Sequence, residues 1–265
     1  MDISVCVNQK KEIYNTFLEF VDSENEEDEK EKYKNLINLF NELNILENSD
    51  EIIEFLTLIN KISMHHQRHQ YFLDRIRKTI TFFESKIKQT FTNLQLFNLF
   101  KYNKVILLFL LNNQIIEVDE DIYQFFFNKT LRDDTNFKTY YEYFYYQLKN
   151  CKLAKRPIFN TRDFDTNKFE NFEEKCQAGV NDSYICQLIR NDSIDEFISY
   201  ISRTNIPLTS KIQSSFFETN SFLINSTPSL IEYAAFYGSI QIYKYLRISK
   251  AEIKPPIWLY AIHGR

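Results

Sequence analysis

The chain has 265 residues, of which 44% are hydrophobic and 16% aromatic, and its formal net charge is −4. This apolar content can offset chain entropy, which excludes a wholly disordered protein. Acids and bases are mixed, so no global field would attract nucleic acid. The chain has only three glycines, and Gly179, Gly238 and Gly264 are too far apart for a phosphate-binding loop or a nucleophile elbow. We therefore expect neither a common nucleotide-binding enzyme nor a serine hydrolase.

Cysteine spacing and hydropathy give expectations about the cellular compartment of the protein. The four cysteines form no CxxC pair, which favours free thiols in a reducing compartment. The first residues lack the basic and apolar segments of a secretory signal. The longest apolar run, 105–111, is far shorter than the roughly 20 residues that a membrane span needs. These features predict an intracellular, cytoplasmic protein with no membrane or nucleic-acid partner.

The first half of the chain shows helical periodicity. An acidic run at 22–31, read as a solvated loop or a first helical turn, precedes an apolar pattern of three- and four-residue steps at 33–43. A second helix starts near Asn48 or Ser49, and a third covers about 71–87. Residues 94–116 predict two short antiparallel helices joined by a tight turn at Tyr102–Asn103.

The middle of the chain is rich in Tyr and Phe. We interpret residues 120–150 as helical and 155–175 as a connecting loop. The tyrosines at 140–146 suit core packing and a partner-binding patch equally well. No strand alternation bounded by hairpin dipeptides occurs, so the chain is predicted to be all-α. Three regions are expected: an N-terminal helical region at 1–116, an aromatic-rich connector at 117–180, and degenerate repeats at 181–265.

Residues 229–248, "SLIEYAAFYG SIQIYKYLRI", contain Gly238 between two short apolar stripes, which predicts a helix, a left-handed glycine turn and a second helix. A shift of 26 residues aligns Gly264 with Gly238, and a shift of 46 residues aligns Asp192 with it. Self-similar helical pairs of this kind indicate a solenoid, in which each short pair is stabilised by stacking on the next.

In these frames the sequence resembles ankyrin repeats, whose unit opens T-P-L-H-x-A-A-x-x-G and continues into a second helix. The matching residues are Pro256, Ile257, Ala261 and Gly264 in one frame, and Ala234, Ala235, Gly238 and "YKYL" at 243–246 in another. The whole chain resembles a divergent protist-type ankyrin family with a helical N-terminal region, through the stretches 65–76, 100–116 and 255–265. Glu232 and Trp258 replace the His that links ankyrin repeats, and residues 216–228 are an insertion.

The resemblance implies an elongated α-solenoid, ankyrin-like in its C-terminal third, that serves as a non-enzymatic protein–protein interaction module or scaffold without a cofactor. Trp258 is expected in the core. In this register the residues after the Ala pair and at the turn tip are the expected contacts with an unknown protein partner: Arg190, Asn191, Phe236, Tyr237, Glu252, Lys254, Ile262 and His263. The sequence ends one helix into a repeat, which predicts either a shortened gene product or further repeats beyond Arg265. In the second case the chain could be a purely structural segment of a larger array.

Two alternatives concern charged and histidine-rich helix positions. His65, His66 and His69 offer two imidazoles one helical turn apart, which suits a metal protein or enzyme, although the general-base Glu of HExxH is absent and a packing cluster explains them better. Arg75, Arg77, Lys78, Lys86 and Lys88 could form a phosphate-binding helix face, but such a charged face is also typical of a surface helix.

Overall fold

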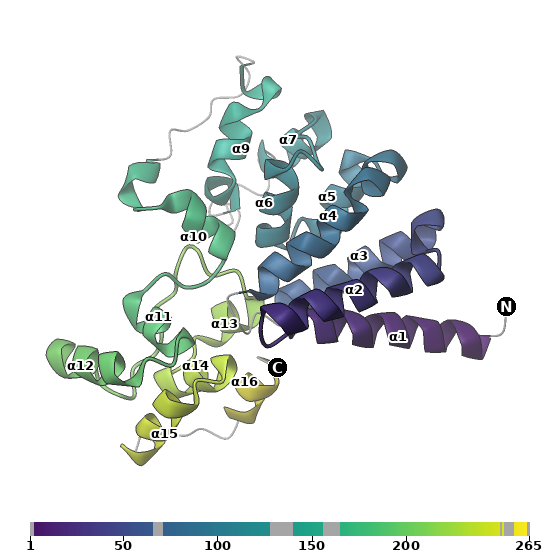
Figure 1. Ribbon diagram of the computed structural model, residues 1–265. Helices are drawn as coiled ribbons and strands as arrows, with labels where there is room; N and C mark the ends of the chain where they lie inside the picture. The colour runs from purple at the N-terminus through teal and green to yellow at the C-terminus, as the bar shows by residue number, and fades with distance from the viewer. Residues whose placement is uncertain are drawn as a thin grey trace. The chain divides into compact units, whose positions relative to one another are not determined.

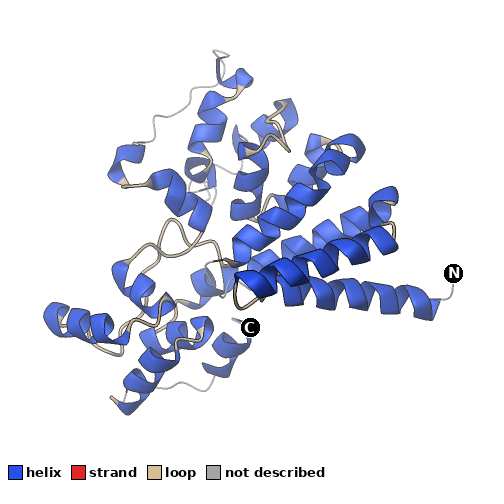
Figure 2. Cartoon of the chain, viewed as in Figure 1, coloured by secondary structure: helices blue, strands red, loops and turns tan. Residues whose placement is uncertain are grey.

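A computed structural model describes residues 3–65, 71–127, 140–155, 165–249, 251 and 257–263. In these ranges the chain is helical and contains no β-strand (Figure 2). One isolated antiparallel bridge, between Lys211 and Ser229, occurs in the described part. The prediction of an all-α chain is therefore confirmed. The chain divides into an N-terminal unit, residues 1–63 and 70–92, and a C-terminal unit, residues 64–69 and 93–265.

The N-terminal unit is built from long helices, α1 (Ile3–Val21), α2 (Glu26–Glu42), α3 (Ser49–His65) and α4 (Phe72–Thr90), with a 3-10 turn η1 (Ile45–Glu47) after α2. Helix α1 packs against α2 and α4. The acidic run forms the first turn of α2, where acids complement the helix dipole, and Asn25 caps it by accepting the Asp28 N–H. Helix α1 was not among the helices predicted from the sequence.

Aromatic packing forms the core of the N-terminal unit. Phe55 contacts Phe17, Phe40 and Phe83 with ring centroids between 5.0 and 5.5 Å apart. All four rings are buried. Edge-to-face aromatic pairs of this kind add to the hydrophobic stabilisation. The predicted apolar stripe of the third helix is confirmed, because its residues are buried in α4: Phe72, Ile76, Ile80, Phe83 and Ile87.

The C-terminal unit contains shorter helices. These are α5 (Asn93–Phe100), α6 (Lys104–Asn112), α7 (Glu120–Phe127), α9 (Tyr145–Asn150), α10 (Phe172–Ala178), α11 (Tyr184–Arg190), α12 (Ile194–Thr204), α13 (Ser221–Ser226), α14 (Leu230–Tyr237), α15 (Ile240–Ile248) and α16 (Ile257–His263), with 3-10 turns η3 (Lys152–Lys155) and η4 (Thr166–Lys168). Helices α5 and α6 with the turn at 101–103 match the predicted antiparallel pair.

Two features of the C-terminal unit differ from the sequence-based expectation, and a third decides between two alternatives that the sequence left open. Its boundary follows Thr92, so α5 and α6 belong with the later helices rather than with the region 1–116. Helix α10 begins at Phe172, inside the expected loop. The aromatic segment is largely core, because Tyr140, Tyr143, Phe144 and Tyr145 are buried, and only Tyr141 and Tyr146 are half-buried.

Helices α11, α12, α14, α15 and α16 form one packed cluster (Figure 1). Helix α14 contacts α11, α15 and α16, while α12 contacts both α11 and α15. Ile189, Phe197, Ala234, Ile242 and Leu246 are fully buried at the centre of this cluster. Small Ala234 allows close approach of the helices, as its position in the pattern suggested.

The two complete hairpins have the same turn. Asp192 and Gly238 both adopt the left-handed conformation, with φ of 51° and 67°. In each case the next residue donates its backbone N–H to the last turn of the first helix, Ser193 to Leu188 and Ser239 to Ala234, over 3.0 and 2.9 Å. The predicted alignment of Asp192 with Gly238 therefore describes the turn geometry correctly.

Candidate functional site

The structure separates the predicted contact residues into exposed and buried groups. Asn191 is exposed, and Ile262 is 59% exposed. His263 is half-buried and stacks on the ring of Phe222, with centroids 4.0 Å apart. Glu252 and Lys254 lie outside the described residues. Among the predicted contacts that the structure describes, only Asn191 and Ile262 therefore have the exposure that a direct contact requires.

The remaining predicted contacts point inward. Phe236 is only 2% exposed, so the expectation that it lies on the surface is wrong. Its ring contacts Phe222 of α13, in the inserted segment. Trp258 shows the opposite error: it is 58% exposed and not part of the core. Phe222 of the inserted segment packs on Phe236 of α14 and on Tyr260 and His263 of α16, which covers these side chains and leaves Trp258 exposed.

Arg190 and Tyr237 are half-buried and belong to a polar cluster between α11 and α14. The Arg190 guanidinium donates to the carbonyl oxygen of Asn181 at 2.7 Å and to the hydroxyl of Tyr233 at 3.0 Å. It also lies 5.9 Å from the ring centroid of Tyr237, within the range of a cation–π contact. Arg190 therefore joins two stacked helices and is unavailable as a surface anchor.

In the register predicted from the sequence, Glu232 stands where an ankyrin unit would have its His. Its carboxylate accepts the backbone N–H of Ser229 at 2.7 Å and the Ser229 hydroxyl at 2.8 Å. These bonds close the first turn of α14 and satisfy a backbone donor that the helix leaves unpaired. Glu232 thus stabilises its own helix instead of linking neighbouring repeats.

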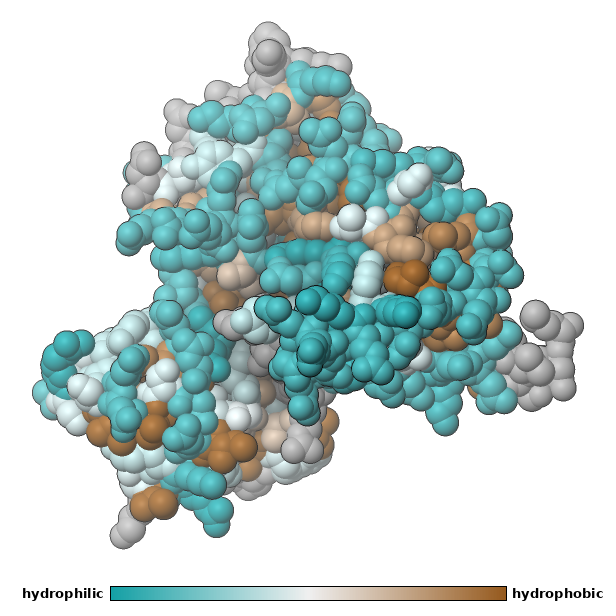
Figure 3. All heavy atoms as spheres, in the orientation of Figure 1, coloured by the Kyte–Doolittle hydropathy of each residue, from teal (hydrophilic) through white to brown (hydrophobic). Residues whose placement is uncertain are grey.

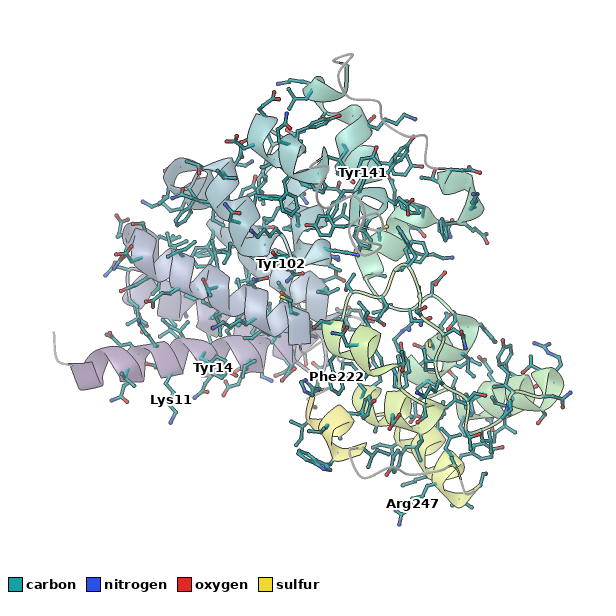
Figure 4. All side chains as sticks on the ribbon, turned by 180° about the vertical axis from the view of Figure 1, so that it is seen from behind. Lys11, Tyr14, Tyr102, Tyr141, Phe222 and Arg247 are labelled. Carbon is teal, nitrogen blue, oxygen red and sulfur yellow. The ribbon has the colours of Figure 1, made fainter. Side chains whose placement is uncertain are left out.

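A cavity of about 710 Å³ opens in the C-terminal unit beside helices α13 and α14. It is lined by Tyr102 in the α5–α6 turn (Figure 4), by the start of α6, by residues 212–216, 218 and 219, and by α13. Its apolar wall includes Ile212, Leu223 and Pro228. Cavities of 300–1,000 Å³ are typical of small-molecule sites. The sequence pattern gave no sign of it, because the lining segments are distant in the chain.

Glu218 lies in the wall of this cavity and is 6% exposed. Its two carboxylate oxygens accept backbone N–H groups, from Asn220 at 2.9 Å and from Asn181 at 3.2 Å. Burial raises the pKa of Glu218 to about 7, although both hydrogen bonds oppose that rise. The carboxyl therefore ties the 180–183 and 218–221 segments together and titrates near neutral pH.

Lys104 is the first residue of α6 and also lines the cavity. Its ammonium lies 5.7 Å from the ring centroid of Tyr140 and 5.2 Å from that of Tyr143. Burial lowers the pKa of Lys104, against the effect of the nearby Cys176 thiol. The cavity wall thus contains one half-buried cation and one buried acid, and burial opposes the charge of each.

The sequence also offered two alternative sites, a basic helix face and a histidine cluster. Arg75 is buried and paired with Glu29, which also pairs with Lys78, so the basic face of this helix is interrupted. The side chains of His65, His66 and His69 lie outside the described part of the structure, so the metal alternative stays a prediction. Among the described residues, no group of three His, Cys, Asp or Glu side chains is placed to hold a metal.

The described cysteines Cys151, Cys176 and Cys186 are free thiols, as predicted. No helix in the described ranges has the length and hydropathy needed to cross a bilayer. A scan against protein-family models, and searches of curated proteins and solved structures, find no match to the chain. The resemblance to ankyrin repeats therefore remains a prediction made from sequence.

Proposed function

We propose that residues 181–263 form a short ankyrin-like solenoid that binds a partner protein and carries out no catalysis. One observation carries the proposal: the two complete hairpins have identical turns and are joined turn to turn. Asp192 accepts N–H groups from the start of α15, and the Ser239 hydroxyl donates to the carbonyl of Ile189 in α11. Such stacked pairs leave a row of helices and turns available for binding.

The binding surface in this proposal is centred on α16. Trp258 and Ile262 are one helical turn apart and are 58% and 59% exposed. On α11, Tyr184 is 48% exposed and Asn191 follows at the turn. Large aromatic side chains left on a surface are the residues that interfaces most often use as anchors. The solenoid would therefore bind through a few aromatic and apolar side chains.

A second exposed apolar group offers a matched control. Ile240 and Ile248 of α15 are 59% and 81% exposed, and hydrophobic atoms appear on the surface over α12 and α15 (Figure 3). These residues lie on the second helix of their hairpin, away from the row formed by α11, α14 and α16. Substitution of Ile248 removes exposed apolar surface without touching the proposed surface.

The test uses the full chain with a photo-crosslinking amino acid at Ile262, expressed in its native cell. We expect one discrete covalent adduct, whose protein is then identified, purified and titrated against the full chain. Trp258→Ala should weaken binding by about tenfold or more, as truncation of an interface anchor does. Ile248→Ala should leave the affinity within about twofold of wild type, because it lies outside the anchor region.

Absence of any discrete adduct from Ile262 and from a second crosslinker at Asn191 would contradict the proposal. Equal affinities of the Trp258→Ala and Ile248→Ala variants would contradict it as well. Far-ultraviolet circular dichroism of each variant verifies that the helices are intact, because both substitutions are at exposed positions and should leave stability nearly unchanged.

A further inference from the structure

The cavity beside α13 and α14 has no part in the proposed function, because neither Trp258 nor Ile262 lines it. Its charged lining side chains are Lys104 and Glu218. Both oxygens of Glu218 are used by the protein's own backbone, at Asn181 and Asn220. The acid is therefore a structural link, and Lys104 is the charged group that remains for a ligand.

Lys104 forms no ion pair with any described residue. The faces of Tyr140 and Tyr143 attract its ammonium, but aromatic rings supply no compensating charge. A partly buried cation without an anion is unusual, since proteins pair buried charges. Its position at the first residue of α6 adds repulsion from the positive end of the helix dipole. An anion at this point would offset both effects.

The size and the walls of the cavity restrict the anion further. One ammonium balances one negative charge, whereas a phosphate group carries about −1.5 to −2 at neutral pH and prefers several donors. The volume of about 710 Å³ is much larger than a carboxylate alone. Ile212, Leu223 and Pro228 offer apolar surface to the rest of the ligand.

We propose that this cavity binds a monocarboxylate with an apolar body, its carboxylate paired with Lys104. The carboxylate belongs either to a free carboxylic acid or to the C-terminus of a peptide; the chemistry at Lys104 is the same. The inference does not depend on the surface of α16, so its failure and the failure of the proposed function are distinguishable.

Isothermal titration of the full chain tests the proposal with two acid–amide pairs. The first pair is 3-phenylpropionate and 3-phenylpropanamide, and the second is acetyl-Leu-Phe with a free or an amidated C-terminus. We expect at least one acid to bind about tenfold or more tightly than its amide, the ratio typical of a hydrogen bond to a charged group. Inorganic phosphate should not compete. Which acid binds identifies the source of the carboxylate.

Lys104→Met removes the ammonium and keeps the length of the side chain. This variant should bind acid and amide equally. The control is Lys149→Met: Lys149 also lies over a tyrosine ring, 5.2 Å from the centroid of Tyr145, but is exposed and does not line the cavity. It should retain the preference of wild type for the acid.

A measurement on Lys104 in the wild-type chain tests the proposal even if the Lys104→Met variant misfolds. Lysines are dimethylated with carbon-13 formaldehyde, and the NMR titration of the Lys104 methyl signal is followed with and without the acid. The pKa of this amine should rise when the acid binds. Equal binding of acid and amide by wild type, no binding of either acid, unchanged binding by Lys104→Met, or an unchanged titration of Lys104 would each overturn the proposal.

Discussion

The carboxylate of Asp192 accepts the backbone N–H of Ile242 over 2.9 Å, and its second oxygen accepts the N–H of Gln241 over 3.0 Å. Asp192 lies in the turn after α11, whereas both donors lie in the first turn of α15. One side chain therefore caps a helix that belongs to the next hairpin. Aspartate is suited to this position, because it tolerates the left-handed backbone that the turn requires.

Substitution of Asp192 separates the capping role from the backbone role. Asp192→Ala should lower the free energy of unfolding by about 2 kcal/mol, since both capping bonds and the tolerance of the left-handed turn are lost. Asp192→Gly should lower it by about 1 kcal/mol, because glycine keeps the turn without strain. Urea unfolding of the full chain measures both. If the glycine variant equals wild type, the cap contributes nothing.

The glycines at 179 and 238 should respond differently to alanine, although both have positive φ, 64° and 67°. A Cβ at Gly238 meets no atom within 4 Å, so Gly238→Ala costs only the left-handed penalty of about 1 kcal/mol. A Cβ at Gly179 would overlap the side chain of Val105, which adds packing strain of about 1–3 kcal/mol. Thermal unfolding ranks the two variants. The double variant Gly179→Ala, Val105→Ala should recover part of the stability that Gly179→Ala loses. If it recovers none, the overlap between the new Cβ and Val105 is contradicted.

Glu218 should make stability depend on pH in an unusual direction. Its pKa is raised from 4.5 to about 7 in the folded state, so the folded protein binds more protons between these values. The free energy of unfolding contributed by this group is full below about pH 4.5 and falls by up to about 3 kcal/mol as pH rises through 7. Urea unfolding of wild type and Glu218→Gln across this range isolates the group. A difference between them that is constant with pH, or that grows with pH, would contradict the assignment.

Arg190 and Tyr233 should be energetically coupled across α11 and α14. Arg190→Met keeps the apolar stem and removes the donors to Asn181 and Tyr233, while Tyr233→Phe removes one acceptor. A double-mutant cycle should give a coupling of about 1–2 kcal/mol, as expected for a buried hydrogen bond to a charged group. Additive effects in denaturant unfolding would show that the pair does not cooperate.

Arg75 should be essential to the N-terminal unit despite its place in a basic stretch. Its guanidinium donates to the carbonyl oxygens of Val21 and Ser23 at 2.9 and 2.8 Å and pairs with Glu29. Arg75→Gln should cost about 3 kcal/mol, because these buried groups lose their partner. Lys88→Gln, on the exposed side of the same helix, should cost under about 0.5 kcal/mol. If the two variants lose similar free energy of unfolding, the buried contacts of Arg75 do not have the expected importance.

Local patterns in the sequence predicted much of the helix content. The acidic first turn of α2, the apolar stripe of α4 and the turn between α5 and α6 each depend on neighbours within a few residues. The equivalence of Asp192 and Gly238 also followed from pattern, because both residue types tolerate positive φ. Such features are determined by backbone geometry and amphipathic spacing.

Features that join distant segments could not be predicted in this way. Phe236 is buried and Trp258 is exposed because the inserted residues 216–228, with Phe222, cover one helix face and leave another open. The cavity at Lys104 and Glu218 joins residues more than a hundred positions apart, and no spacing rule connects them. Which face an insertion covers is decided by packing across the unit and not by the residues beside it.

Tyr233 serves two structures at once, since its ring lines the cavity and its hydroxyl accepts a hydrogen bond from Arg190. A molecule seated against that ring would resist any separation of the helical layers, because whatever binds only the closed arrangement must oppose its opening. A ligand in this cavity would therefore add to the free energy that holds α11 against α14.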